Sequence, residues 1–244
     1  MPRQHDSPWR QTIAAFLFLA VFIFGMIGCA SPQLAPTATS PSTMNQTQLD
    51  GELIDAAERG ELARVQDLLA KGASVHAADA RKRTALIAAA YGDHVQVGRA
   101  LITAGADVNV QDDTQQSAYL IPTADGGLEF LKLTLANGAD VHSLDSYNGT
   151  GLIRAADRGH VEIIRELLET DIQIDHINNL GWTALLEAII LGDGGKNHTE
   201  VVRLLVDAGA NVNLADRNGV TPLQHARQRD FRDIIAILQQ AGAR

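Results

Sequence analysis

Cysteine is nearly absent from this sequence, since Cys29 is the only one among 244 residues. A lone cysteine excludes an intramolecular disulfide and any metal site built on paired cysteines. Aromatic residues are also scarce, at 5%, although the hydrophobic fraction as a whole reaches 45%. A core made mainly of aliphatic and small side chains is typical of closely packed helices, so we expect an all-α fold.

Positive charge is in short supply as well. The chain has 20 Lys and Arg residues against 29 Asp and Glu residues, which gives a formal net charge of −9. Proteins that bind nucleic acid need clustered basic side chains to displace counterions from the phosphates. The charge balance therefore argues against nucleic acid as a partner.

The N-terminus has the features of a targeting segment. A hydrophobic stretch without charge runs from Ile13 to Phe24 and follows the basic residues Arg3 and Arg10. The Gly28-Cys29 pair that comes next resembles a bacterial lipoprotein box. The resemblance implies that residues 1–28 are a signal peptide and that Cys29 is lipidated. It places the chain in the bacterial cell envelope, facing the periplasm, with the outer membrane favoured over the inner membrane.

An uncleaved transmembrane anchor is the alternative interpretation of this segment. The hydrophobic residues 13–27 number about 15, slightly fewer than the roughly 20 that a membrane-spanning helix needs. The short length and the cysteine that follows favour lipidation. Residues 29–47 are uncharged and rich in Pro, Ser and Thr, a composition that predicts a flexible tether.

The rest of the chain repeats itself every 33 residues. Gly72, Gly105 and Gly138 follow this period, and so do Gly209 and Gly242. Hydroxyl residues keep the same register at Thr84, Ser117, Thr150 and Thr183, and the next one, Thr221, comes after 38 residues. A five-residue insertion, 193–197, accounts for the longer step. Such a period is typical of repeat solenoids.

Each unit predicts two short antiparallel helices. In the fourth unit Thr150 would cap the first helix, Gly159 would end it, and the apolar positions from Ile163 to Leu168 would form one face of the second helix. We therefore predict an all-α repeat solenoid over residues 48–244. The predicted units are 48–80, 81–113, 114–146, 147–179, 180–217 and 218–244.

Several short motifs within these units resemble the ankyrin-repeat family. They are Thr221-Pro222-Leu223, Gly159-His160, the run Val201 to Leu205, and Gly105-Ala106-Asp107-Val108-Asn109. The resemblance implies a stack of helix-turn-helix units with projecting β-hairpins. It also implies a protein partner that lies along the concave surface made by the hairpin tips and the first helices.

Three features depart from the family pattern. The histidine of the family's Thr-Pro-Leu-His motif is replaced in every unit, mostly by Ile or Leu. Pro122 falls inside the first helix of the third unit and predicts a kinked or short helix. One interpretation of this feature is a tolerated local defect. The other is a notch beside Tyr119 in which a partner could bind. The loop 192–197 predicts either a harmless insertion or a recognition loop of low order.

The hairpin tips supply the candidate binding residues. Tyr147, Leu180 and Trp182 fall on neighbouring tips, and exposed aromatic side chains near Arg dominate many interface energies; Trp182 could instead pack on its own hairpin. Charged residues of the first helices, among them Arg154, Asp157 and Glu187, would line the same groove or form a solvated face. The candidate partner-binding residues are Arg81, Lys82, Arg83, Gln115, Tyr147, Asn148, Leu180, Trp182, Arg217 and Asn218.

The histidines do not predict an enzyme or a metal site. His94, His160 and His198 share one column of the repeat, while His76 and His142 share another. Neighbouring units stack about 10 Å apart, whereas metal ligands lie about 2 Å from one ion. The sequence also lacks HExxH, CxxC, a phosphate-binding glycine loop and a Gly-x-Ser-x-Gly motif. We expect no catalysis, no cofactor, no metal and no small-molecule substrate.

The leading hypothesis is a non-enzymatic, membrane-tethered scaffold that binds a protein partner of unknown identity. An accessory or immunity protein, which would protect a periplasmic enzyme or neutralise a toxin, is the alternative. A purely structural spacer is the third hypothesis.

Overall fold

The computed structural model describes residues 44–244, and these residues form twelve helices. No extended strand occurs among them; the only β pairing they show is two isolated antiparallel bridges, Ala78 with Thr84 and Gln111 with Ser117. The helices are α1 (Gln46–Glu58), α2 (Leu62–Ala70), α3 (Ala85–Tyr91), α4 (Val95–Thr103), α5 (Leu120–Asp125), α6 (Leu128–Leu135), α7 (Gly151–Arg158), α8 (Val161–Leu168), α9 (Ala184–Ile190), α10 (Lys196–Asp207), α11 (Pro222–Gln228) and α12 (Arg232–Gln240).

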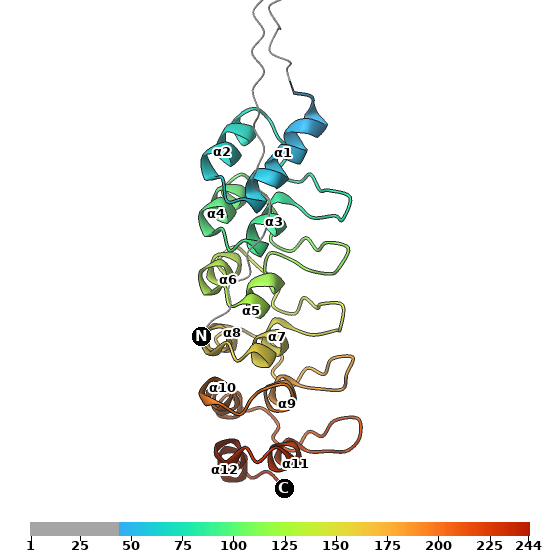
Figure 1. Ribbon diagram of the computed structural model, residues 1–244, viewed down its shortest axis with the longest axis vertical. Helices are drawn as coiled ribbons and strands as arrows, with labels where there is room; N and C mark the ends of the chain where they lie inside the picture. The colour runs from blue at the N-terminus through green and yellow to red at the C-terminus, as the bar shows by residue number, and fades with distance from the viewer. Residues whose placement is uncertain (1–43) are drawn as a thin grey trace, which may run out of the picture. The chain divides into compact units, whose positions relative to one another are not determined.

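The helices stand in two columns, as Figure 1 shows. The odd-numbered helices form one column and the even-numbered helices form the other, with one pair from each unit. The loops between units project from the side of the odd-numbered column. This arrangement confirms the predicted all-α solenoid of helix pairs. The projecting hairpins contain no paired strands, and single bridges close only the first two of them.

A repeated hydroxyl residue stands directly before α3, α7, α9 and α11, whereas Tyr119 precedes α5 in the third unit. The Thr84 Oγ1 accepts a hydrogen bond from the Ile87 N–H at 3.3 Å, and the Thr150 Oγ1 accepts one from the Ile153 N–H at 3.4 Å. These bonds satisfy backbone donors that have no partner inside the helix. The predicted capping role is confirmed, and Ser117, Thr183 and Thr221 make the same bond in their own units.

Gly159 ends α7 as the sequence predicts. Its φ of 69° lies in the left-handed region, which a glycine adopts without the steric cost of a Cβ. The chain then turns directly into α8, so the two helices of the unit pack against each other.

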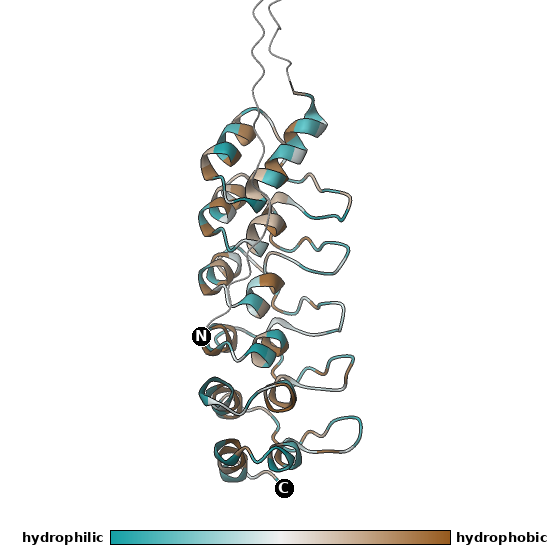
Figure 2. Ribbon diagram, viewed as in Figure 1, coloured by the Kyte–Doolittle hydropathy of each residue, from teal (hydrophilic) through white to brown (hydrophobic). Residues whose placement is uncertain are grey.

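Apolar side chains of both columns form the core, and Figure 2 shows hydrophobic residues recurring in every layer of helices. The buried residues divide into two clusters, one N-terminal and one C-terminal. Both clusters include residues of unit 114–146: Ile121 and Phe130 belong to the N-terminal cluster, while Tyr119, Leu120 and Leu131 belong to the C-terminal cluster. The third unit therefore joins two halves of the core.

The third unit also bears out the prediction that Pro122 shortens its first helix. Helix α5 has 6 residues, whereas α3, α7 and α9 have 7 or 8. The predicted notch beside Tyr119 is wrong, because this side chain is only 1% exposed. Its hydroxyl lies against Gly151, where a Cβ would approach the Oη to 2.6 Å. A larger residue at 151 would clash there, so the tyrosine fills the space that the notch would have occupied.

The insertion is ordered, contrary to the alternative of a loop of low order. Lys196 and Asn197 form the first turn of α10, which makes this helix 12 residues long. The Gly192 carbonyl accepts a hydrogen bond from the Arg229 guanidinium at 2.8 Å. Gly194 faces the Phe231 ring, which a Cβ at this position would meet at 2.3 Å. The insertion thus packs against the last unit.

Three N-terminal predictions, the signal peptide 1–28, the lipidation of Cys29 and most of the tether 29–47, lie outside the described residues. Within them, α1 begins at Gln46, so the predicted boundary at 48 is two residues late. None of the described helices is both long and apolar enough to cross a bilayer.

Candidate functional site

The projecting loops share one construction, and we name them fingers 1 to 5: residues 79–83, 112–116, 145–149, 178–182 and 216–220. Each begins with an Asp or Asn whose Oδ1 accepts two backbone hydrogen bonds. In finger 3 the Asp145 Oδ1 accepts from the N–H groups of Tyr147 and Gly149, both at 2.8 Å. Such side-chain bonds replace those of a regular strand pair and fix the turn. The other fingers begin with Asp79, Asp112, Asn178 and Asp216.

These carboxylates and the Asn178 amide were not among the predicted site residues, although they follow the same period of 33 and the same longer step as the hydroxyl residues. A second consequence of the turn is a left-handed backbone near the tip. Lys82, Gln115 and Asn148 have φ values of 60°, 60° and 59°. Three of the predicted binding residues thus occupy one structural position in successive fingers, and Gly181 occupies it in finger 4.

The candidate binding residues differ in how free they are. Tyr147 is 62% exposed and Leu180 is 45% exposed. Trp182 is only partly exposed, which agrees better with packing on its own hairpin than with a projecting aromatic side chain. Arg81, Lys82, Gln115, Arg217 and Asn218 are exposed as well.

Two other candidates are held by neighbouring side chains. Arg83 is half-buried and pairs with Asp79 at 2.8 Å and with Glu58 at 3.4 Å. The Asn148 carbonyl accepts a hydrogen bond from the His176 Nε2 at 2.7 Å. Both residues therefore have structural roles in the fingers.

A hollow of about 270 Å³ lies between fingers 3 and 4 and the helices α7 and α9. We name it the Glu187 hollow after the acid of α9 at its base. Exposed apolar side chains border it, including Leu191, which is 49% exposed. The side chains that line it include Tyr147, Arg154, Asp157, Arg158, Leu180 and Leu191. Of the ten candidate binding residues, the structure brings only Tyr147 and Leu180 together here.

Glu187 is a buried acid, only 4% exposed. The pKa of its carboxyl is raised to about 7. Burial is the largest cause of the raised pKa, the hydrogen bond from the Asn178 amide opposes it, and the Asp157 and Asp145 carboxylates add to it. That bond joins Asn178 Nδ2 to Glu187 Oε1 at 2.6 Å. The finger and the helix are thus joined through the acid at the base of the hollow.

Arg154 crosses the hollow from α7. Its guanidinium donates to the Asp145 Oδ2 and to the Gln116 Oε1, both at 2.9 Å. Its Nε is buried without a hydrogen-bond partner. The side chain therefore links fingers 2 and 3 to α7. It lines the hollow, as predicted for the groove, but its guanidinium is already engaged by Asp145 and Gln116.

The histidines of the shared column connect neighbouring units. Each donates a hydrogen bond from Nε2 to a backbone carbonyl at the end of an earlier odd-numbered helix: His94 to Glu58 at 3.0 Å, His160 to Ala124 at 2.9 Å and His198 to Asp157 at 3.0 Å. These contacts give the column a structural role. No group of three or more His, Cys, Asp or Glu side chains comes together for a metal within residues 44–244.

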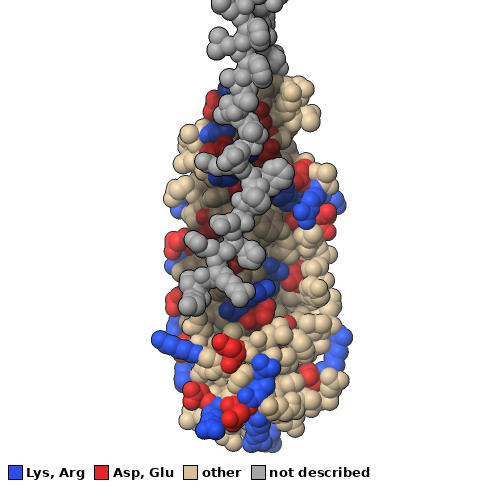
Figure 3. Space-filling model, in the orientation of Figure 1, with Lys and Arg blue, Asp and Glu red and all other residues tan. Residues whose placement is uncertain are grey.

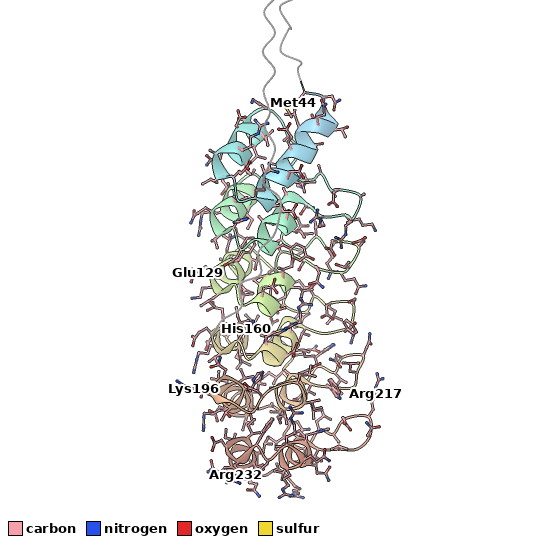
Figure 4. The ribbon with its side chains drawn as sticks, in the orientation of Figure 1. Met44, Glu129, His160, Lys196, Arg217 and Arg232 are labelled. Atoms are coloured by element: carbon pink, nitrogen blue, oxygen red, sulfur yellow. The ribbon has the colours of Figure 1, made fainter. Side chains whose placement is uncertain are left out.

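The surface carries mixed charge. On the face shown in Figure 3, basic and acidic side chains lie interspersed. The basic residues Lys196, Arg217 and Arg232, labelled in Figure 4, come from α10, finger 5 and α12. The described residues that Figure 3 leaves uncovered show no broad basic field.

Comparisons with known proteins agree with this architecture. A family model described as ankyrin repeats (3 copies) matches residues 53–123 and 120–196, and a model of one ankyrin repeat matches residues 180–217. The Escherichia coli (strain K12) protein YahD, named as an ankyrin repeat protein, is 50% identical over 64 residues. This match spans 26% of the chain and only 32% of that relative.

Solved structures are similar over a larger part of the chain. An ankyrin repeat domain from Acinetobacter baumannii AYE is 47% identical with a TM-score of 0.76, covering 79% of this chain and 98% of its own. The ankyrin repeat protein EF0377 is 33% identical with a TM-score of 0.75, covering 78% and 98%. The human ASB11 ankyrin repeat domain is 26% identical with a TM-score of 0.69, covering 79% and 84%.

Proposed function

The chain belongs to the ankyrin-repeat family, and from that premise we propose that it is a non-enzymatic scaffold that binds one protein partner in the bacterial envelope. Ankyrin repeats are generally protein-interaction scaffolds. The partner would lie on the side of the odd-numbered helices, where the fingers project.

The observation that carries this proposal is the group of exposed apolar side chains around the Glu187 hollow. Tyr147, Leu180 and Leu191 are 62%, 45% and 49% exposed and line one hollow. Apolar side chains gathered at a concave surface and rimmed by charge are typical of binding sites, because their burial releases water. We place the centre of the interface there rather than at the basic tips of finger 1.

Affinity capture from solubilised envelopes tests the binding role. The double variant Tyr147→Ala/Leu180→Ala should lose the partner that the unaltered chain captures, because each truncation at the centre of an interface costs about 1 to 4 kcal/mol. The matched control is Tyr91→Ala, which removes a tyrosine of similar exposure, 44%, from outside the hollow. An unchanged set of captured proteins in the double variant would refute the proposed surface.

We further propose that the scaffold is held at the outer membrane by acyl chains on Cys29, with residues 29–45 as the tether. The support is the sequence alone: basic residues, an uncharged hydrophobic segment and then the chain's single cysteine. Metabolic labelling with an alkyne fatty acid should mark the unaltered chain and not Cys29→Ser. Labelling of the variant, or envelope fractionation that leaves the protein in the inner membrane, would contradict the proposal.

A further inference from the structure

The Glu187 hollow has one acid that lacks a cationic partner within the hollow. Of the acids that line it, Asp145 pairs with Arg154 at 2.9 Å, and Asp157 pairs with Arg158 at 3.3 Å. Among the described residues, Glu187 forms no ion pair, and the single hydrogen bond of its side chain comes from the neutral Asn178 amide. When Glu187 is ionised, the hollow is therefore short of one cation.

One of the two carboxylate oxygens of Glu187 is available to a ligand. Asn178 occupies Oε1, while Oε2 has no hydrogen-bond partner among residues 44–244. Among the described residues, only one side-chain N or O atom is both fully buried and without a hydrogen-bond partner, and that atom is the Arg154 Nε. Since Glu187 Oε2 has no partner either, it must be in contact with solvent. The Glu187 side chain is 96% buried by its neighbours, with an exposure of only 4%, yet it lines the hollow. A ligand group that enters the hollow can reach it.

The apolar side chains that border the hollow suit a ligand with a long aliphatic chain. Tyr147, Leu180 and Leu191 stand at the border of the hollow with roughly half of their surfaces exposed. A lysine side chain buries its four methylene groups against such surfaces and carries its charge at the end. An aromatic ring near the entry adds attraction for the cation.

The geometry points to a lysine of the protein partner, inserted between Tyr147 and Leu180 with its ammonium group on Glu187 Oε2. Lysine fits better than arginine, because Asn178 leaves a single carboxylate oxygen, which a point donor can use and a two-pronged guanidinium cannot. This inference rests on the proposed binding role of the same surface. It adds the chemical class of the residue that is recognised.

A peptide selection tests the inference without knowledge of the natural partner. A phage-displayed library of random 12-residue peptides is panned against the full-length chain in mild detergent, and the peptides that bind are measured by fluorescence anisotropy. Peptides that bind in the hollow are recognised because they bind the Tyr147→Ala/Leu180→Ala variant more weakly than the unaltered chain. We expect them to share a lysine with apolar neighbours.

A double-mutant cycle then isolates the contact. The variant Glu187→Gln keeps an oxygen that accepts from Asn178, and replacing the peptide lysine with norleucine keeps its methylenes. Each change alone should weaken binding about tenfold or more, and both together should weaken it little further, because the coupling of a close charge pair reaches 1.5 kcal/mol or more. The control is Glu162→Gln, an acid on α8 whose side chain is 67% exposed, which should leave the affinity unchanged.

The possible failures are distinct. Peptides that need Tyr147 and Leu180 but tolerate both Glu187→Gln and norleucine would overturn the lysine inference and leave the proposed binding surface intact. Peptides whose affinity does not change in Tyr147→Ala/Leu180→Ala would overturn both the lysine inference and the proposed binding surface. A selection that yields no binding peptide would do the same. Arginine that replaces the peptide lysine without loss of affinity would overturn the choice of lysine.

Discussion

At the scale of single residues, Glu187 makes the stability of the fold depend on pH. Its pKa is raised to about 7 in the folded chain and returns to about 4.5 in the unfolded chain. Between these values the folded state holds more protons than the unfolded state. The free energy of unfolding therefore falls as pH rises from about 4.5 to above 7, by an amount on the order of 3 kcal/mol.

Urea unfolding at pH 5 and pH 8 measures this effect. The variant Glu187→Gln cannot ionise, so its stability relative to the unaltered chain should be higher at pH 8 than at pH 5. Glu162→Gln serves as the control and should follow the unaltered chain at both values. Parallel profiles for the unaltered chain and Glu187→Gln would show that the buried carboxyl keeps an ordinary pKa.

The carboxylate that begins a finger also stabilises the fold. In Asp145→Ala the N–H groups of Tyr147 and Gly149 lose their acceptor, and Arg154 loses its ion pair. We expect a loss of about 2 to 4 kcal/mol, because both a charged hydrogen-bonded group and its buried partner are affected. Thermal melting measures it, with Asp113→Ala as the control, because Asp113 is an exposed acid of finger 2. An equal loss in the two variants would contradict the role of Asp145 in the turn.

At the scale of elements, the histidine column connects neighbouring helix pairs. His160 donates to the Ala124 carbonyl across the junction between the third and fourth units. Substituting alanine should lower the free energy of unfolding by about 1 kcal/mol or more, because the carbonyl at the end of α5 loses its partner. Urea unfolding tests this, and His142→Ala is the matched control because that histidine is exposed. A cost no larger than that of the control would refute the linking role.

The helices differ in how far the local sequence determines where they begin and end. A capping hydroxyl and a glycine at the end define α7, and both are readable from the sequence since they act within one turn. The short α5 was predictable for the same reason, because Pro122 lacks a backbone N–H. The extension of α10 was not, since the insertion is held by Arg229 and Phe231 of the following unit.

At the scale of the whole molecule, the third unit joins the two core clusters. Each unit of a solenoid contacts only its neighbours, so cooperativity depends on every junction. Tyr119 is fully buried in the C-terminal cluster within this unit. Tyr119→Ala should cost about 3 to 5 kcal/mol, as other large-to-small core changes do, and should separate the unfolding of the two halves.

Two optical probes distinguish the halves in a Trp9→Phe background. Trp182 then reports only on the C-terminal half, because the chain has 2 tryptophans, while far-ultraviolet circular dichroism reports on all helices. In urea the two transitions should coincide in the unaltered chain and diverge in Tyr119→Ala. Tyr91→Ala, which changes a partly exposed tyrosine, should keep them together. Coincident transitions in Tyr119→Ala would show that the junction does not depend on this side chain.

The sequence by itself determined the period, the helix pairs and the caps of α3, α7, α9 and α11, because these follow from interactions within one or two turns and from a repeat that places them in register. It also pointed to Tyr147, Leu180 and Glu187 as neighbours in one groove. Only the tertiary structure decided which candidates are free and which are held. Arg83 and Arg154 are bound by side chains from neighbouring units, Asn148 is bound by His176, and Trp182 is partly buried. Burial and hydrogen bonding between units depend on how the layers stack, and no local pattern records that.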